Sequence, residues 1–262
     1  MALSIDDLLR RAVEQKASDL HLKVGNHPYL RVDGVLNPIT EVPRITPEEM
    51  LSMAFSMMTN RQKQKFKETA ELDMAYGVAG LGRFRVNVFQ QRGNVGMVLR
   101  VIPTKIRTSE ELNLPPVITK ICEEQRGLVL VTGTTGSGKS TTLAAMIDRI
   151  NATRSDHLIT IEDPIEFLHR DKRSFINQRE VEVDTANFST ALRAALRQDP
   201  DVILVGEMRD LETISTALLA AETGHLVFST LHTLDATETI QRIIAVFLRQ
   251  NKNRFVCSSP QL

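Results

Sequence analysis

The chain has 262 residues, 42% of them hydrophobic, which is enough for one large domain or two modest ones. Lys and Arg number 32, as do Asp and Glu, and this balance argues against nonspecific nucleic-acid binding, which needs an excess of cations. No apolar run approaches the roughly 20 residues of a membrane span, and no signal peptide is recognisable. Cys122 and Cys257 match no disulfide or zinc pattern. A cytoplasmic location is therefore expected.

Residues 1–102 are predicted to form a small α+β domain with an antiparallel sheet. Ser4 begins an amphipathic helix in the manner of a capping box. Short strands follow at about 20–22 and within 29–35, where Asp33-Gly34 is typical of a hairpin turn. Thr46 caps the next expected helix, which has proline at its first position and ends near residue 58.

Alternation between residues 83 and 89 predicts a half-buried strand. Its apolar face carries Phe84, Val86 and Val88, and its polar face carries Arg83, Arg85 and Asn87. A glycine turn leads into a second strand at 95–102. The polar residues that follow, 103–116, include prolines and are interpreted as a linker.

Residues 117–247 predict an α/β domain with a parallel sheet, because strands alternate with helices. Continuous apolar runs are typical of strands covered on both faces, and they occur at 128–132, 157–161, 202–205 and 226–228. Helices are expected at 141–150, 187–197 and 211–223, with Gly224 just after the last of them.

A complete phosphate-loop pattern, G-x-x-x-x-G-K-[ST], follows the first of these strands and precedes a helix. Glycines let the backbone turn its N–H groups toward a polyphosphate, and the helix adds the positive end of its dipole. Lys139 is expected to reach the β- and γ-phosphates of ATP, and Ser140 to bind Mg²⁺. The predicted nucleotide-binding residues are Gly133, Thr134, Thr135, Gly136, Ser137, Gly138, Lys139, Ser140 and Thr141.

Hydrolysis also needs a group that orients water and support for the metal. Glu162, Asp163 and Glu166 follow a buried strand directly, and the carboxyl ends of parallel strands line a ligand crevice. A second strand ends in Gly206-Glu207, with glycine at the place of the usual Walker B aspartate, so Glu207 is expected to serve the metal through water. An ordinary acidic loop and a solvated glutamate are the alternative interpretations.

His225 and His232 stand at the two ends of the last apolar strand. Either side chain could hydrogen-bond a γ-phosphate and report its loss. For each of them, the equal alternative is a structural role, in which the ring makes its hydrogen bonds within the fold.

Four segments in this order resemble the Walker A, Asp box, Walker B and His box of secretion and pilus motor ATPases. They are the phosphate loop, TIEDPIE at 160–166, ILVGEMRDLET at 203–213 and GHLVFSTLHT at 224–233. NQREV at 177–181, ASDLHL at 17–22 and RVDG at 31–34 point the same way, and the resemblance covers residues 1 to 247. It is strongest to the retraction ATPases of type IV pili (the PilT family), because the further amino-terminal domain and four-cysteine motif of assembly relatives are not found here.

The resemblance implies a PAS-like domain, then a RecA-like P-loop NTPase domain, in a homo-hexameric ring. It implies hydrolysis of ATP with Mg²⁺, with Glu166 as catalytic base, Glu207 as Walker B carboxylate, and His225 and His232 sensing phosphate. It further implies a motor at the inner face of the cytoplasmic membrane, which powers pilus retraction and twitching motility through a platform protein of the pilus machinery. Membrane association is expected through partners only, without direct nucleic-acid binding.

The ring gives the arginines of the first domain a candidate role. One subunit can offer cations to the γ-phosphate of its neighbour, as arginine fingers do. Arg83, Arg85 and Arg100 are the candidates, because they lie on polar strand faces of that domain. A solvated sheet face is the alternative for each.

The family pattern stops after Phe247, and residues 248–262 show no helical or strand period. The tail after Phe247 can be written in codons such that one added base in front of them shifts the reading frame. The shifted frame then encodes PPPKQKQVRLQLASV, which resembles the family's continuation. We therefore expect a single-base deletion here, and with it loss of the rest of the ATPase domain.

Three other functions stay open at this stage. The first is a related accessory pilus ATPase, or one that serves secretion or DNA uptake. The second is a RecA-like nucleic-acid motor, which the neutral charge and the lack of an aromatic and basic strand disfavour. The third is a regulator that binds ATP without turnover, which the full set of carboxylates disfavours.

Overall fold

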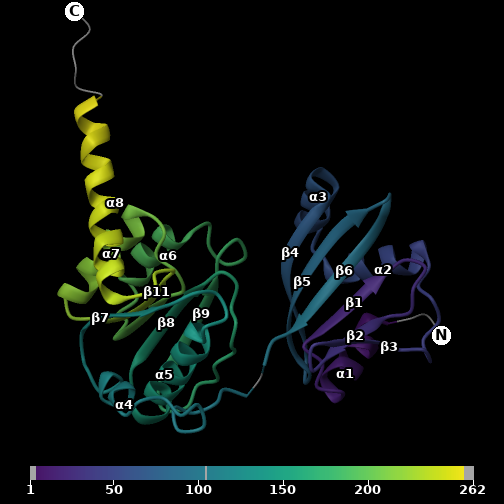
Figure 1. Cartoon of the computed structure of the whole chain (residues 1–262), viewed down its shortest axis with the longest axis horizontal. Helices are drawn as coiled ribbons and strands as arrows, with labels where there is room; N and C mark the ends of the chain where they lie inside the picture. Colours follow the sequence, from purple (N-terminus) through teal and green to yellow (C-terminus); the bar gives the residue numbers. More distant parts are fainter. Residues whose placement is uncertain (1–3, 104, 257–262) are drawn as a thin grey trace, which may run out of the picture. The chain divides into compact units, whose positions relative to one another are not determined.

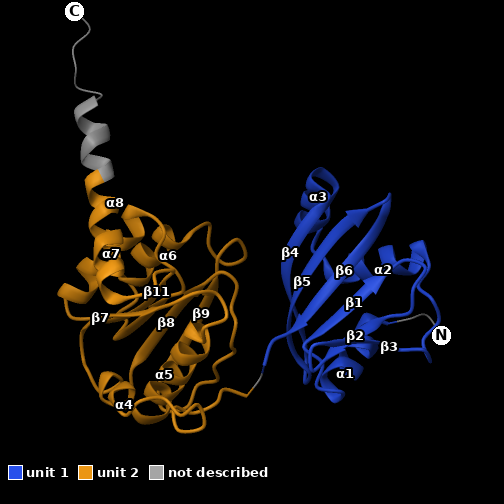
Figure 2. Ribbon diagram, in the orientation of Figure 1, with its two compact units in different colours: residues 1–104 blue, residues 105–262 orange. Residues whose placement is uncertain are grey.

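The computed structural model describes residues 4–103 and 105–256, with side chains up to residue 248 (Figure 1). The chain divides into two compact units, residues 1–104 and 105–262 (Figure 2). The division falls inside the segment that the sequence suggests as a linker. Within the described residues, no helix has the length and apolar character needed to cross a membrane.

Unit 1 is an antiparallel six-stranded sheet in the order β3-β2-β1-β6-β5-β4, with three helices. Its strands are β1 (Asp19–Lys23), β2 (Tyr29–Val32), β3 (Val35–Pro38), β4 (Glu71–Val78), β5 (Gly82–Gln91) and β6 (Asn94–Val101). Its helices are α1 (Ile5–Glu14), α2 (Pro47–Met57) and α3 (Asn60–Thr69). The antiparallel sheet predicted for this half is confirmed, whereas its likeness to a PAS domain stays a prediction.

Local sequence explains most of these elements. Thr46 caps α2 in a complete capping box with Glu49. Ser4 precedes α1 as predicted, but its side chain makes no capping hydrogen bond. Neither α3 nor β4 was predicted; α3 shows no amphipathic pattern, because it is polar nearly all round and buries only Phe66.

Unit 2 contains a parallel five-stranded sheet in the order β7-β11-β10-β8-β9. Its strands are β7 (Gly127–Thr132), β8 (His157–Glu162), β9 (Phe175–Glu180), β10 (Val202–Val205) and β11 (Leu226–Leu231). Its helices are α4 (Val117–Ile121), α5 (Lys139–Thr153), α6 (Phe188–Ala195), α7 (Leu211–Glu222) and α8 (Ala236–Val256). The predicted α/β class with a parallel sheet is thereby confirmed.

Helices cover both faces of this sheet, which explains why its inner strands are continuously apolar. On one face, Met146 and Ile150 of α5 pack with Leu158 of β8. On the other, Leu192 of α6 and Ala217 of α7 share a cluster of buried residues with β8 and β10. The phosphate-loop helix and the α6–α7 pair therefore lie on opposite faces of one sheet.

Three elements of unit 2 differ from the sequence prediction, and the first is the short helix α4, which was not expected. Strand β9 was not predicted, because its residues are mostly polar and it lies at the sheet edge. The absence of helical structure after Phe247 was also predicted wrongly, since α8 continues to Val256. Leu, Arg and Gln at 248–250 favour helix, and neither glycine nor proline interrupts it. Residues 257–262 lie outside the described residues, and the proposed change of reading frame stays a prediction.

Candidate active site

A cavity of about 400 Å³ opens at the carboxyl ends of the parallel strands in unit 2. This is the edge of an α/β sheet at which ligands usually bind. Its lining combines the phosphate loop and first turns of α5, the loop after β8, the end of β10 and the end of β11. From the predicted set, the lining includes Thr135, Gly136, Gly138, Lys139, Ser140, Thr141, Glu166, Glu207 and His232.

The phosphate loop owes its shape to glycine. Gly136 and Gly138 have φ of 79° and 95°, in the left-handed region that other residues rarely adopt. Gly133 has φ of 145°, which other residues also rarely adopt, and a Cβ there would lie 2.6 Å from Ser137 Oγ, so that the serine side chain would have to move. Gly133, Thr134 and Ser137 therefore shape the loop without belonging to the cavity lining.

Lys139 is the first residue of α5 and is held by its own loop. Its Nζ donates hydrogen bonds to the carbonyl oxygens of Gly133 at 2.9 Å and Thr134 at 2.8 Å. The ammonium thus stays at the entrance to the helix, next to the N–H groups that a helix start leaves without helical partners. Together they form a concentrated positive site for phosphate.

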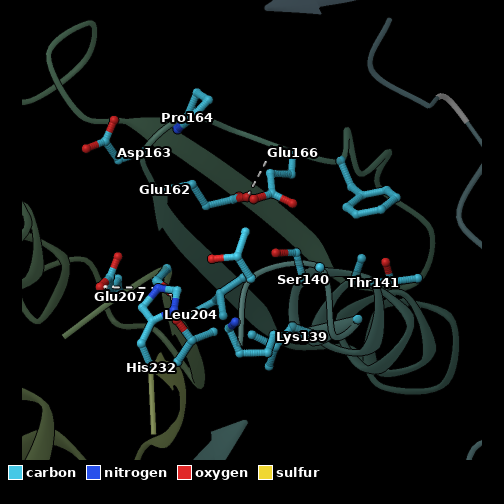
Figure 3. Close-up of a pocket in the computed structure, with 18 of the residues that line it drawn as sticks. Lys139, Ser140, Thr141, Glu162, Asp163, Pro164, Glu166, Leu204, Glu207 and His232 are labelled. Atoms are coloured by element: carbon cyan, nitrogen blue, oxygen red, sulfur yellow. Dashed lines mark hydrogen bonds and ion pairs between the residues drawn. The ribbon is translucent and has the colours of Figure 1, made fainter. Parts of the chain in front are cut away.

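Two carboxylates face this positive site from the loop after β8. The side chains of Glu162 and Glu166 lie side by side, whereas the Asp163 carboxylate points away from them (Figure 3). Glu162 accepts hydrogen bonds from Thr160 Oγ1 at 2.6 Å, Gln178 Nε2 at 3.1 Å and the Glu166 N–H at 3.4 Å. Burial raises the pKa of Glu162, and those three hydrogen bonds oppose the rise by favouring the carboxylate.

Glu207 lies at the end of β10 and has two cationic or polar neighbours. Arg209 Nε donates to its Oε1 at 2.6 Å, and His232 Nε2 lies 3.5 Å from the same oxygen. The hydrogen bond to Glu207 raises the pKa of Arg209, which is therefore fully charged. Arg209 also lines the cavity, and the sequence analysis did not single it out.

Gly206 explains why no aspartate stands at the usual Walker B place. A Cβ there would lie 3.2 Å from the Ile161 carbonyl oxygen and 3.4 Å from Glu162 Cα. Gly206 also donates its N–H to that Ile161 oxygen at 2.8 Å. The close approach of β10 to β8 thus favours glycine here, and Glu207 is the carboxylate that follows this strand.

The two predicted histidines are separated by the whole length of β11. His232 follows the carboxyl end and lines the cavity, but His225 precedes the amino end and is not among the lining residues. Six strand residues between them correspond to about 20 Å. His225 donates from Nδ1 to the Ala220 carbonyl oxygen at 2.9 Å, which is the structural role. His225 therefore lies apart from the cavity of its own chain, and its role in sensing phosphate stays a prediction.

The three candidate arginines lie on one face of the sheet in unit 1. Arg85 of β5 is the register partner of Arg100 of β6, and Arg83 lies two residues from Arg85. Arg100 Nε donates to Asp19 at 2.9 Å, yet 64% of the Arg100 side chain is exposed. Arg85 Nε lies 3.9 Å from Asp73. Their placement on a polar face agrees with the prediction, and a role as arginine finger stays a proposal.

Sequence reasoning also missed His169, which lines the cavity from the loop after β8. Burial lowers the pKa of His169 to about 4, so the imidazole is neutral near pH 7. Its Nδ1 is buried without a hydrogen-bond partner among the described residues. A lone histidine in a polar loop carries no sequence signal that could have identified it.

The residues of the cavity fit a nucleoside triphosphate with Mg²⁺. The Lys139 ammonium and the start of α5 suit phosphate, and the Ser140 hydroxyl is an oxygen ligand of the kind that Mg²⁺ accepts. Among the described residues, no group of three or more His, Cys, Asp or Glu could hold a metal alone.

Comparison with known proteins agrees with this geometry. Residues 1–255 match the family described as type II/IV secretion system protein. The type IV pilus retraction ATPase PilT of Pseudomonas aeruginosa is 52% identical over 95% of this chain and 72% of its own length. A twitching motility protein of Neisseria gonorrhoeae is 49% identical over 94% of this chain and 66% of its own length, so the chain spans slightly less than two thirds of that relative.

A solved structure of the pilus retraction motor PilT with bound ADP superposes with a TM-score of 0.89. It is 54% identical, and the match covers 93% of this chain and 71% of the other. The family resemblance read from the motifs is thereby confirmed.

Proposed function

The chain belongs to the family of type II/IV secretion system proteins, and from this premise we propose that it is an ATP-hydrolysing motor subunit for type IV pilus retraction and twitching motility. One observation supports the proposal most strongly. Lys139 and Ser140 share a single cavity with Glu162, Glu166, Glu207 and His232. A nucleotide-binding protein without turnover would have no need of so many acidic groups around the phosphate position.

Each residue of the cavity has a distinct proposed role. Lys139 binds the β- and γ-phosphates, and Ser140 supplies its hydroxyl to Mg²⁺, which neutralises phosphate charge when bound. Glu166 orients the attacking water and accepts its proton. Glu162 is less suited to that role, because three donors already occupy its carboxylate. Glu207 contacts the metal shell through water, and His232 responds to the γ-phosphate from the next strand.

The proposed assembly is a homo-hexameric ring at the inner face of the cytoplasmic membrane. Its proposed partner is a platform protein of the pilus machinery, which carries the ring to the membrane. ATP binding and phosphate loss would change the contacts between neighbouring subunits of the ring, and successive subunits would convert this into movement. The named relatives, a retraction ATPase and a twitching motility protein, support this assignment.

Arg83, Arg85 and Arg100 are the proposed source of a cation from the neighbouring subunit. Arginine fingers contribute about 10³–10⁵-fold to kcat in other phosphoryl-transfer enzymes. Alanine at the true finger should therefore lower kcat at least about 100-fold while ADP affinity is retained. If all three alanine variants hydrolyse ATP at the wild-type rate, none of them is the finger.

The direct test is steady-state phosphate release by the purified chain and by its Glu166→Gln variant. The wild-type chain should hydrolyse ATP in the presence of Mg²⁺. The variant should bind ATP with unchanged affinity and lose about 10²–10⁴-fold in kcat, the usual contribution of a general base. Wild-type turnover by Glu166→Gln would refute the base assignment, and no phosphate release by any preparation would refute the proposed hydrolysis.

A further inference from the structure

Strand β9 carries a motif, Asn177-Gln178-Arg179-Glu180-Val181, to which the proposed function gives no role. None of its residues lines the cavity. The strand pairs in parallel with β8, so that Gln178 is the register partner of Thr160 and Glu180 that of Glu162. Since register partners share a face, Gln178 and Glu180 face the same side as the carboxylate of Glu162.

Gln178 holds the acidic loop, residues 162–169, with every polar atom of its amide. Its Nε2 donates to Glu162 Oε1 at 3.1 Å and to the Phe167 carbonyl oxygen at 2.9 Å. Its Oε1 accepts the N–H of His169 at 2.8 Å. The partners fix the amide orientation, because two acceptors face the NH₂ group and one donor faces the oxygen.

Glu180 completes the hold on the middle of the loop. It is 3% exposed, and its Oε2 accepts the N–H of Ile165 at 3.1 Å. The Val181 N–H donates to the Glu162 carbonyl oxygen at 2.8 Å and ties the start of the loop to the end of β9. The loop is thus attached to β9 at Glu162, Ile165, Phe167 and His169, on both sides of the proposed base, Glu166.

We infer that Gln178 and Glu180 form a clamp that positions the acidic loop for hydrolysis without contacting the nucleotide. This inference rests on the proposed function, since it assigns positioning residues to the same site. Neither clamp residue is among those that line the cavity, so the clamp should act on turnover and not on nucleotide affinity. A misplacement of a reacting group by about 1 Å can cost on the order of 100-fold in rate.

The chain offers a matched control on the same strand. Asn177 points to the opposite face and donates from Nδ2 to His157 Nε2 at 2.9 Å, away from the acidic loop. Asn177→Leu and Gln178→Leu therefore each remove an amide from an edge strand. A general weakening of β9 would affect both variants equally, whereas loss of the clamp would affect only Gln178→Leu.

The kinetic test compares kcat and KM for ATP in both variants and in Gln178→Glu. Gln178→Leu should lose about 100-fold in kcat with KM within about threefold, and Asn177→Leu should keep kcat within about threefold. Gln178→Glu keeps the size and the acceptor but cannot donate to Glu162, so its kcat should fall as far as that of Gln178→Leu. Equal losses in Asn177→Leu and Gln178→Leu, or a full rate in Gln178→Glu, would overturn the inference.

A second measurement decides the clamp independently of catalysis. Amide hydrogen exchange, resolved by NMR, should be about tenfold faster at His169 in Gln178→Leu than in wild type and unchanged in Asn177→Leu. Equal exchange at His169 in all three proteins would contradict the clamp. A wild-type chain without ATP turnover would refute the proposed hydrolysis, and the exchange rates would still decide whether Gln178 holds the loop.

Discussion

The two walls of the cavity are supported in different ways. The phosphate loop shapes itself, because its glycines, its helix start and the bonds from Lys139 to Gly133 and Thr134 all lie within eight residues. The acidic loop is shaped from outside, by Gln178 and Glu180 on a neighbouring strand. The comparison teaches that the binding half of the site is encoded locally and the hydrolysing half depends on tertiary structure.

The largest effect should come from the self-supported wall. Lys139→Ala removes the only side-chain cation of the phosphate loop, and we expect loss of about 10³-fold or more in kcat/KM together with weak ATP binding. Fluorescent-nucleotide titration and phosphate release measure the two losses. Retained ATP affinity in this variant would mean that the loop backbone suffices for binding and that the Lys139 ammonium is not needed for it.

A middle-sized effect is expected at Gly206, where the end of β10 approaches the start of the acidic loop. Gly206→Ala places a methyl group 3.2 Å from the Ile161 oxygen and 3.4 Å from Glu162 Cα, so β8 and the start of the acidic loop must shift. We expect about 1–2 kcal/mol of destabilisation and a fall in kcat of about tenfold. Gly77→Ala is the control, since its Cβ would meet nothing within 4 Å. Denaturant melts and kcat measure both variants, and equal behaviour would remove the steric argument.

The smallest effect should come from a single donor to the acidic loop. Thr160→Val removes one of three hydrogen bonds that favour ionised Glu162, so the pKa of Glu162 should rise further. If the carboxylate form is needed, activity falls as pH drops through this pKa, and the acid limb of the kcat profile should move to higher pH. Near neutral pH we expect a loss of only about threefold. An unmoved acid limb would show that Glu162 does not limit the rate.

This contrast also explains how much could be predicted. Gly138, Lys139 and Ser140 were found because a continuous stretch of sequence encodes both their shape and their chemistry. The α/β class followed from continuously apolar strands, which are typical of a sheet covered by helices on both faces. Gln178 and Arg209 were not assigned roles, because their partners are brought close only by sheet register and by the turn after β10.

The histidines show the same limit in another form. His225 and His232 look equivalent in sequence, since each adjoins the same apolar strand. Parallel strands give the two ends of β11 different surroundings, and only the carboxyl end meets the cavity. A pattern of residue types cannot reveal which end of a strand faces a ligand until the neighbouring strands are known.

The hydrogen bonds of Lys139 to its own loop have a consequence for ligand choice. Two of the three N–H donors of the ammonium bond to carbonyl oxygens, and one is left for a ligand. A polyphosphate offers several charged oxygens at once and can take all three donors, whereas chloride offers a single weak acceptor. The loop therefore favours a polyphosphate over a small singly charged ion before any contact with a nucleoside is made.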